Sequence, residues 1–176
     1  MKILISAFAP FDGRKTNASA EVLELLNMDN LTKIILPVTY NESFQILEKE
    51  IERIHPQMVI CLGEAINREY ITVERIAINC MDSSIPDQAG VKYQGTPIKR
   101  GEDGIFSTFD LSKIDKKNIS YSAGTYVCNN LFYNLMSYTT CKNLSIKAGF
   151  IHIPSLTIYK NYSNVAKELL AIINKI

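Results

Sequence analysis

The sequence predicts an α/β fold, a three-layer α/β/α sandwich around a mostly parallel, mixed central sheet. Continuous apolar runs at residues 3–7, 58–62 and 148–153 have the length of strands that are buried on both faces. Residues 41–54 carry apolar side chains along one helical stripe and charged side chains on the opposite face. Because strands and helices alternate along the chain, we expect a mainly parallel sheet covered by helices on both sides.

The first half of the chain supplies most of the expected sheet. Its elements, in order, are a strand at 3–7, an irregular loop containing Phe8 and Phe11, a short helix capped by Asn17 or Ser19, a strand at 33–38, a helix at 41–54 capped by Asn41, a strand at 58–62 and a turn at Gly63. The helix at 41–54 is expected to end at His55, because the residue before a proline avoids helical geometry.

The second half of the chain is less regular. A β-rich stretch at 71–79 precedes a surface excursion at 82–99 that contains several prolines and glycines. For residues 101–118 we expect at most a short helix, near 105–106 or 111–114. The remaining elements, in order, are a β-like run at 119–121, a helix with Cys128 in its first turn and Thr125 as its N-cap, a strand at 148–153 that ends at Pro154, and a final helix from Asn161 or Ser163.

Length and composition indicate a single domain spanning residues 1–176. The formal net charge of +1 argues against a nucleic-acid or anionic-membrane partner. No apolar run approaches the roughly 18 residues that span a bilayer, and the N-terminus lacks the apolar length of a signal peptide. The four cysteines lack metal-site spacing, and a chain of this size needs no disulfides, so a cytoplasmic location is expected.

Cys128 is the candidate nucleophile. It follows a turn at Ala123-Gly124 and falls where unpaired backbone N–H groups and the helix dipole favour negative charge. The pKa of a thiol in such a place can fall from about 8.5 toward neutrality, which makes a thiolate available. The residues alone leave a second reading open, in which Cys128 is a small buried apolar side chain on the helix face of Leu131 and Leu135.

His152 is the better placed of the two histidines to act as a base for Cys128. His55 lies at the exposed end of a helix, whereas His152 lies near the end of the apolar strand that follows the Cys128 helix. A Cys–His pair can form a thiolate and deliver a proton to a leaving group. The alternative is a histidine that is simply hydrogen-bonded in the core.

A third group must orient the imidazole, and Glu74 is the candidate. A carboxylate within the apolar stretch at 71–79 would cost several kcal/mol if it were buried without a partner. That partner could be the N–H of His152 or a neighbouring arginine, and the spacing does not choose between them. The arginines in question are Arg68 and Arg75, and the other carboxylates that could orient His152 are Glu64, Asp82 and Asp87.

Five segments between residues 3 and 154 carry long residue patterns. They are Phe8-x-Pro-Phe11-Asp-Gly13, Val73-Glu74-Arg75-Ile-Ala-Ile-Asn79, Ile85-Pro86-Asp87, Ser122-Ala-Gly-Thr-Tyr-Val-Cys128-Asn129 and Gly149-Phe-Ile-His152-Ile-Pro154. In this order they resemble pyroglutamyl peptidase I, the cysteine exopeptidase also called pyrrolidone-carboxylate peptidase. The resemblance implies an α/β/α fold, no metal or cofactor, and often a homotetramer.

The resemblance also implies an activity and a site. The substrates would be peptides with an N-terminal pyroglutamate (5-oxoproline), which the enzyme removes. Cys128 would be the nucleophile, His152 the general acid and base, and Glu74 the orienting carboxylate. The positions implied for the pyroglutamyl pocket are Phe8, Phe11, the segment at Val127 and, near them, Asn17.

Three departures from the family pattern leave two alternatives open. Ser84 stands where many members have an arginine with a suggested role near the oxyanion, and Glu64-Ala-Ile-Asn-Arg68 replaces a pattern with Gln or Leu and two glycines. The chain is also shorter between Gly90 and Asn118. Losing one oxyanion donor can cost about 10²–10³ in turnover. Because the three residues Cys128, His152 and Glu74 are all present, we expect activity, either slow or with a shifted preference. The alternatives are a related cysteine amidohydrolase for another small lactam or amide, and a weakly active or non-catalytic pyroglutamate-binding protein.

Overall fold

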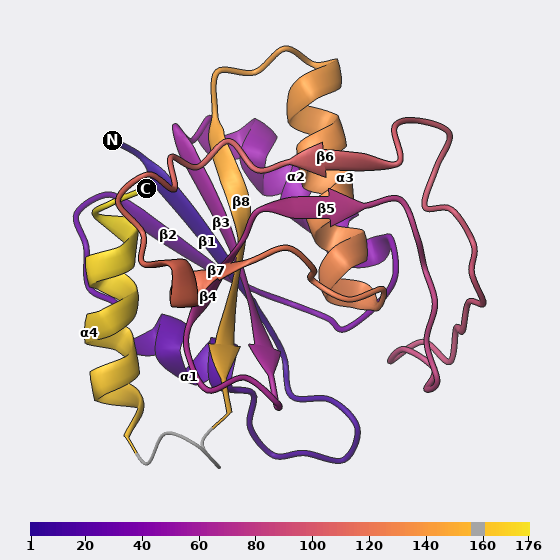
Figure 1. Ribbon diagram of the computed structural model, residues 1–176, viewed down its shortest axis with the longest axis horizontal. Coiled ribbons are helices and arrows are strands. Elements are labelled where there is room, and N and C mark those ends of the chain that lie inside the picture. Colours follow the sequence, from indigo (N-terminus) through magenta and orange to yellow (C-terminus); the bar gives the residue numbers. More distant parts are fainter. Residues whose placement is uncertain (156–160) are drawn as a thin grey trace.

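The computed structural model describes residues 1–155 and 161–176. Its main feature is a six-stranded sheet in the order β2-β1-β3-β8-β4-β7 (Figure 1). The strands of this sheet are β1 Ile3–Phe8, β2 Leu31–Leu36, β3 Met58–Ala65, β4 Thr72–Glu74, β7 Ile119–Ser120 and β8 Lys147–Pro154. The other elements are β5 Ile76–Ile78 and β6 Gly104–Phe106, which pair with each other, the helices α1 Ala18–Leu25, α2 Glu42–Ile54, α3 Val127–Cys141 and α4 Tyr162–Ile173, and the short 3₁₀ helix η1 Lys116–Asn118.

The sheet is mostly parallel, as the alternation of strands and helices predicts. β2, β1, β3 and β8 run parallel to one another, and β4 and β7 form a second parallel pair. The two groups meet where β4 pairs antiparallel with β8. The predicted α/β class with a mixed, mainly parallel sheet is therefore confirmed.

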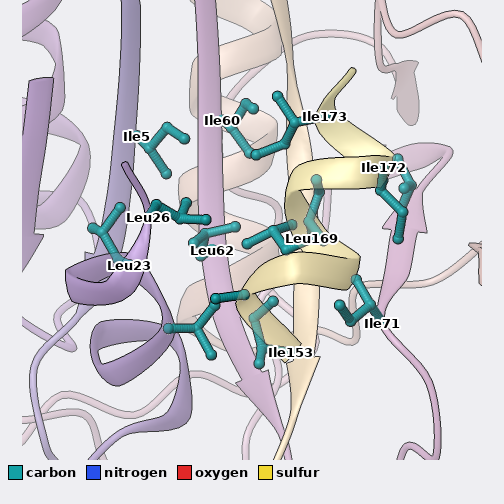
Figure 2. Close-up of a cluster of buried hydrophobic side chains, with 14 of the residues drawn as sticks. Ile5, Leu23, Leu26, Ile60, Leu62, Ile71, Ile153, Leu169, Ile172 and Ile173 are labelled. Atoms are coloured by element: carbon teal, nitrogen blue, oxygen red, sulfur yellow. The ribbon is translucent and has the colours of Figure 1, made fainter. Parts of the chain in front are cut away.

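One face of the sheet packs on α1 and α4 through an entirely apolar cluster (Figure 2). Ile5, Ile60 and Leu62 point from the strands toward Leu23 of α1 and Leu169 of α4. Burying such side chains stabilises the fold by about 1.5–3 kcal/mol each. The buried side chains of this cluster are all apolar, so the cluster contributes packing and no titratable group.

The opposite face packs on α2 and α3 and mixes apolar with polar side chains. Phe132 and Leu135 of α3 and Leu47 of α2 lie against Phe150 of β8 in a second cluster. Four of the eight strand residues of β8 alternate toward this face, and His152 follows Phe150 by two positions. The third layer thus brings the start of α3 over the carboxyl ends of β3 and β8.

Helix capping follows the sequence in two of four cases. Asn17 caps α1 and Asn161 caps α4, each accepting a hydrogen bond from the backbone N–H two residues later. Asn41 lies at the N-cap of α2, but its side chain makes no capping bond. The prediction for Thr125 is wrong, because Tyr126 is the N-cap residue of α3 and the Thr125 hydroxyl donates to the carbonyl of Asp82 instead.

Three local predictions need correction. Gly63 does not end a strand, since β3 continues through it to Ala65. The stretch at 71–79 forms two strands in two different sheets, because Arg75 interrupts it and its backbone N–H pairs with the carbonyl of Ser120. Residues 105–106 belong to a strand that pairs with β5, and 111–114 contain a turn, so neither forms the expected short helix. Among the described residues, no helix has the length and apolar content needed to cross a membrane.

Candidate active site

Cys128 and His152 lie on the same face of the sheet, on either side of Gly63. Gly63 is the register partner of His152 in the parallel pair of β3 and β8. A Cβ atom on Gly63 would lie 2.9 Å from the sulfur of Cys128 and 2.8 Å from the ring of Phe150. Only glycine lets the start of α3 approach the sheet this closely. Sequence reasoning missed this role, because a glycine after an apolar run is also typical of a turn.

The Cys128 thiol is the second residue of α3 and lines a pocket. Its position in the first helical turn is as predicted, but the direction of its pKa shift is not. Burial, with the negative charge of Glu74 as a smaller contribution, raises the pKa of Cys128 to about 12. The backbone N–H of Cys128 and the charge of Arg68 act in the opposite direction and are outweighed. Burial therefore favours the neutral thiol over the thiolate.

His152 is bound by Glu74 across two antiparallel strands. Thr72 pairs with His152 in the register of β4 and β8, which places Glu74 two residues farther on the same face. The Nδ1 atom of His152 lies 2.7 Å from Oε1 of Glu74. A carboxylate accepts hydrogen bonds, so Nδ1 carries the proton and Nε2 is left with a free lone pair. This is the tautomer that a general base requires.

Glu74 has both of the partners that the sequence left open. Nη1 of Arg68 donates to the same oxygen, Oε1, at 2.6 Å, while its Nη2 donates to the carbonyl of Ser122 at 2.7 Å. Arg75 is engaged elsewhere, with its guanidinium 4.7 Å from the ring centre of Phe106. Oε2 of Glu74 is buried and has no hydrogen-bond partner among the described residues. The carboxylate thus lies between an arginine and a histidine.

The substitute carboxylates have other partners. Asp87 accepts from the backbone N–H groups of Tyr40, Ala89 and Val91, which ties down the excursion after β5. Asp82 accepts from the backbone N–H of Gly95. Within the part of the chain that the structure describes, no hydrogen bond links the Cys128 thiol to the His152 ring. Their proximity follows from their shared neighbour Gly63.

A pocket of about 220 Å³ opens beside the thiol. Three of the four residues expected in the substrate pocket line it, namely Phe8, Phe11 and Asn17, together with Cys128. Val127 is fully buried beneath the helix start, and its side chain is not part of the lining. The Asn17 amide is already used, since it caps α1 and donates to the carbonyl of Ala9.

Tyr126 closes one side of this pocket. Its ring lies 6.2 Å from that of Phe11 and packs edge-on against Tyr40 at 5.6 Å, and its hydroxyl donates to the carbonyl of Pro86. Burial raises the pKa of Tyr126, so its hydroxyl stays protonated as a donor. The pocket therefore combines aromatic and aliphatic walls with polar and charged groups, an arrangement that can hold a small ring.

Asn129 fixes the start of α3 and was not singled out from the sequence. Its buried amide accepts from the N–H of Ile78 and donates to the carbonyls of Ile78 and Cys80. These bonds hold the residue after Cys128 against the end of β5. An amide within the patterned stretch around Cys128 was the available signal, but its partners are about 50 residues away along the chain.

Two of the departures from the family pattern lie in different places. Ser84 is exposed and lines a separate surface pocket rather than the one beside Cys128. Glu64 lines the pocket beside Cys128, and its carboxylate pairs with Arg14 at 2.6 Å. In the residues described by the structure, no group of three or more His, Cys, Asp or Glu side chains is arranged to hold a metal ion.

Comparison with known proteins agrees with this geometry. The sequence profile described as pyroglutamyl peptidase matches residues 1–164. A pyrrolidone-carboxylate peptidase of Thermoanaerobacter sp. (strain X514) is 42% identical over 172 residues, covering 90% of this chain and 84% of that protein. Pyrrolidone-carboxylate peptidase 1 of Caldanaerobacter subterraneus subsp. tengcongensis is 38% identical, covering 96% and 94%.

Solved structures show the same relationship. The crystal structure of pyroglutamyl peptidase I from Bacillus amyloliquefaciens superposes with a TM-score of 0.88 at 31% identity, covering 96% of this chain and 92% of that chain. A mutant pyrrolidone carboxyl peptidase from Pyrococcus furiosus superposes with a TM-score of 0.87 at 31% identity, covering 99% and 97%. The chain belongs to the pyroglutamyl peptidase family of cysteine peptidases.

Proposed function

We propose that this protein removes N-terminal pyroglutamate from peptides, with Cys128 as nucleophile, His152 as general acid and base, and Glu74 as the orienting carboxylate. The observation that carries the proposal is a thiol that opens into an aromatic pocket, beside a histidine bound to a buried carboxylate. Family membership supports the same reaction. Phe8 and Phe11 would pack on the lactam ring, and the backbone at Val127 and Asn17 would border it.

The first half of the reaction is acylation. Nε2 of His152 takes the proton from the Cys128 sulfur as that sulfur attacks the carbonyl carbon that joins pyroglutamate to the next residue. The C–N bond then breaks, and His152 returns its proton to the departing amine. Because burial raises the pKa of the thiol, we expect proton transfer to accompany attack. Glu74 stabilises the imidazolium that forms.

The second half is hydrolysis of the thioester. His152 removes a proton from water, whose oxygen attacks the thioester carbonyl, and the sulfur leaves and regains a proton. In both halves the negative oxygen would be stabilised by backbone N–H groups at the start of α3, including that of Cys128. These N–H groups lack intrahelical partners and lie beside the positive end of the helix dipole. The reaction needs no oxidant and no further reactant.

We also propose the setting of this reaction. Residues 1–176 would form one catalytic domain that works in the cytoplasm on pyroglutamylated peptides. The four cysteines support a reducing compartment, since each is a free thiol in the structure. By resemblance to the family we expect a homo-oligomer, with a tetramer as the first possibility to test. No nucleic-acid partner is expected from a net charge of +1.

A fluorogenic pyroglutamyl amide tests the proposal. The wild-type protein should release the fluorophore, and Cys128→Ala should remove that activity. Cys141→Ala is the matched control. Cys141 has an exposed thiol and lies at the opposite end of the same helix from Cys128. If the protein hydrolyses other small amides but not the pyroglutamyl amide, the result favours the related amidohydrolase. Binding of the lactam without turnover would favour the non-catalytic alternative, and either result would overturn the proposal.

A further inference from the structure

A second buried carboxylate lies in the wall of the pocket beside Cys128. Oε1 of Glu64 is bonded to Nη2 of Arg14 at 2.6 Å, and Oε2 accepts from the backbone N–H of Ala18 at 2.8 Å. The Glu64 side chain is 4% exposed, whereas that of Arg14 is 42% exposed. A carboxylate this buried needs a cation or donors to remain charged, and Arg14 is the cation.

The turn that carries Phe11 also directs Arg14 toward Glu64. Asp12 and Gly13 both have positive φ angles, and the N–H of Arg14 closes the turn on the carbonyl of Phe11. The side chain of Arg14 then reaches Glu64 near the end of β3. The pair therefore joins the aromatic wall of the pocket to the sheet.

The buried carboxylate of this pocket is neutralised only when Arg14 is counted. Its lining includes two carboxylates, Asp12 and Glu64, and one cation, Arg14. The N–H of Ala18, at the start of α1, adds partial positive charge at Glu64. Without Arg14, the pocket would hold a buried carboxylate with one donor and would favour a positively charged guest.

We infer that Arg14 is a specificity-determining residue, which neutralises Glu64 so that the pocket prefers an uncharged lactam to a cationic ring. This inference rests on the proposed function. The discriminated substrate class is the peptide with N-terminal proline, whose ring has the same size but carries a secondary ammonium instead of a lactam amide. Specificity of this kind arises from an unfavourable element against the competitor, here the guanidinium of Arg14.

The test compares two fluorogenic amides with the same reporter, one pyroglutamyl and one prolyl. Arg14→Gln should lower the ratio of their kcat/KM values, pyroglutamyl over prolyl, by about tenfold or more. The double variant Arg14→Gln/Glu64→Gln should bring the ratio back to within about threefold of wild type. Lys15→Gln is the matched control, because it removes an exposed positive charge next to Arg14 and lies outside the pocket lining.

Each outcome decides between the two proposals. An unchanged ratio in a folded Arg14→Gln variant, or a double variant as impaired as the single one, overturns the role of Arg14. A wild-type protein that fails to cleave the pyroglutamyl amide overturns the proposed function itself. If Arg14→Gln unfolds at a lower temperature than Lys15→Gln, the variant Arg14→Lys is measured in its place. Because lysine retains the positive charge, Arg14→Lys must keep the wild-type ratio of the two kcat/KM values.

Discussion

Two glutamates near the ends of β3 and β4, the strands that flank β8 in the sheet, have similar surroundings and different second partners. Glu74 ends β4 and Glu64 is the penultimate residue of β3, and their side chains are 0% and 4% exposed. Each is bonded to an arginine at 2.6 Å. Glu74 also binds the ring of His152, whereas Glu64 accepts from a backbone N–H of α1.

This difference shows that a buried ion pair alone does not identify a carboxylate that takes part in a reaction. An arginine next to a buried carboxylate is what charge burial requires in any protein. What separates the two regions is whether the carboxylate also touches a group that can move protons. By this criterion we assign Glu74 to the proposed reaction and Glu64 to the shape and charge of the pocket.

The largest effect is expected from removing His152, the second partner of Glu74. His152→Gln should lower kcat for the pyroglutamyl amide by about 10²–10⁴-fold, because His152 is the group proposed to take the thiol proton. His55→Gln is the matched control and should leave kcat unchanged, since His55 is exposed at the end of α2. If both folded variants lost the same share of kcat, the loss would not be specific to His152. The contact with His152 would then no longer distinguish Glu74 from Glu64.

A smaller effect should separate the glutamates directly. Glu74→Gln keeps the volume of the side chain but loses the charge that orients and stabilises His152, and kcat should fall about 10–100-fold. Glu64→Gln should change kcat by about fivefold or less, because Arg14 is partly exposed and can be solvated. The measurement is steady-state kinetics at several pH values. A Glu64→Gln variant slower than Glu74→Gln would reverse the assignment.

The smallest effect concerns the charge that Arg68 places near the thiol. Arg68 lowers the pKa of Cys128, so Arg68→Gln should raise that pKa further and reduce the thiolate fraction at a given pH. Alkylation of Cys128 by iodoacetamide, followed on the Cys128 peptide by mass spectrometry, should slow by roughly twofold to fivefold at mildly alkaline pH. Arg68→Lys retains the charge and should alkylate at nearly the wild-type rate. Faster alkylation in Arg68→Gln would contradict the claim that the charge of Arg68 lowers the pKa of Cys128.

Sequence patterns were sufficient for the fold class, and they singled out residues that line one pocket together with Cys128. The apolar runs that became β1, β3 and β8 are long and uniform, so their burial on both faces could be read directly. The residue patterns around Cys128 and His152 located the two groups that flank Gly63. Short strands such as β6 were missed, because three residues carry too little periodicity to separate strand from helix.

What could not be predicted depends on contacts between distant segments. The close approach of α3 to Gly63, the anchoring of Asn129 to β5 and the double pairing of Glu74 all need coordinates. The same holds for the thiol of Cys128. A helix N-terminus predicts a lowered pKa, but burial against the sheet outweighs it.

The central claim is that the sulfur of Cys128 faces the site where a pyroglutamyl group binds. A pyroglutamyl chloromethyl ketone tests it directly, because the sulfur displaces chloride and forms a stable bond to the ketone carbon chain. Peptide mass spectrometry should find the label on Cys128, with labelling slowed by excess 2-pyrrolidone. Label on Cys80 or Cys141 instead, or labelling of Cys128 that the free lactam does not slow, would contradict the account.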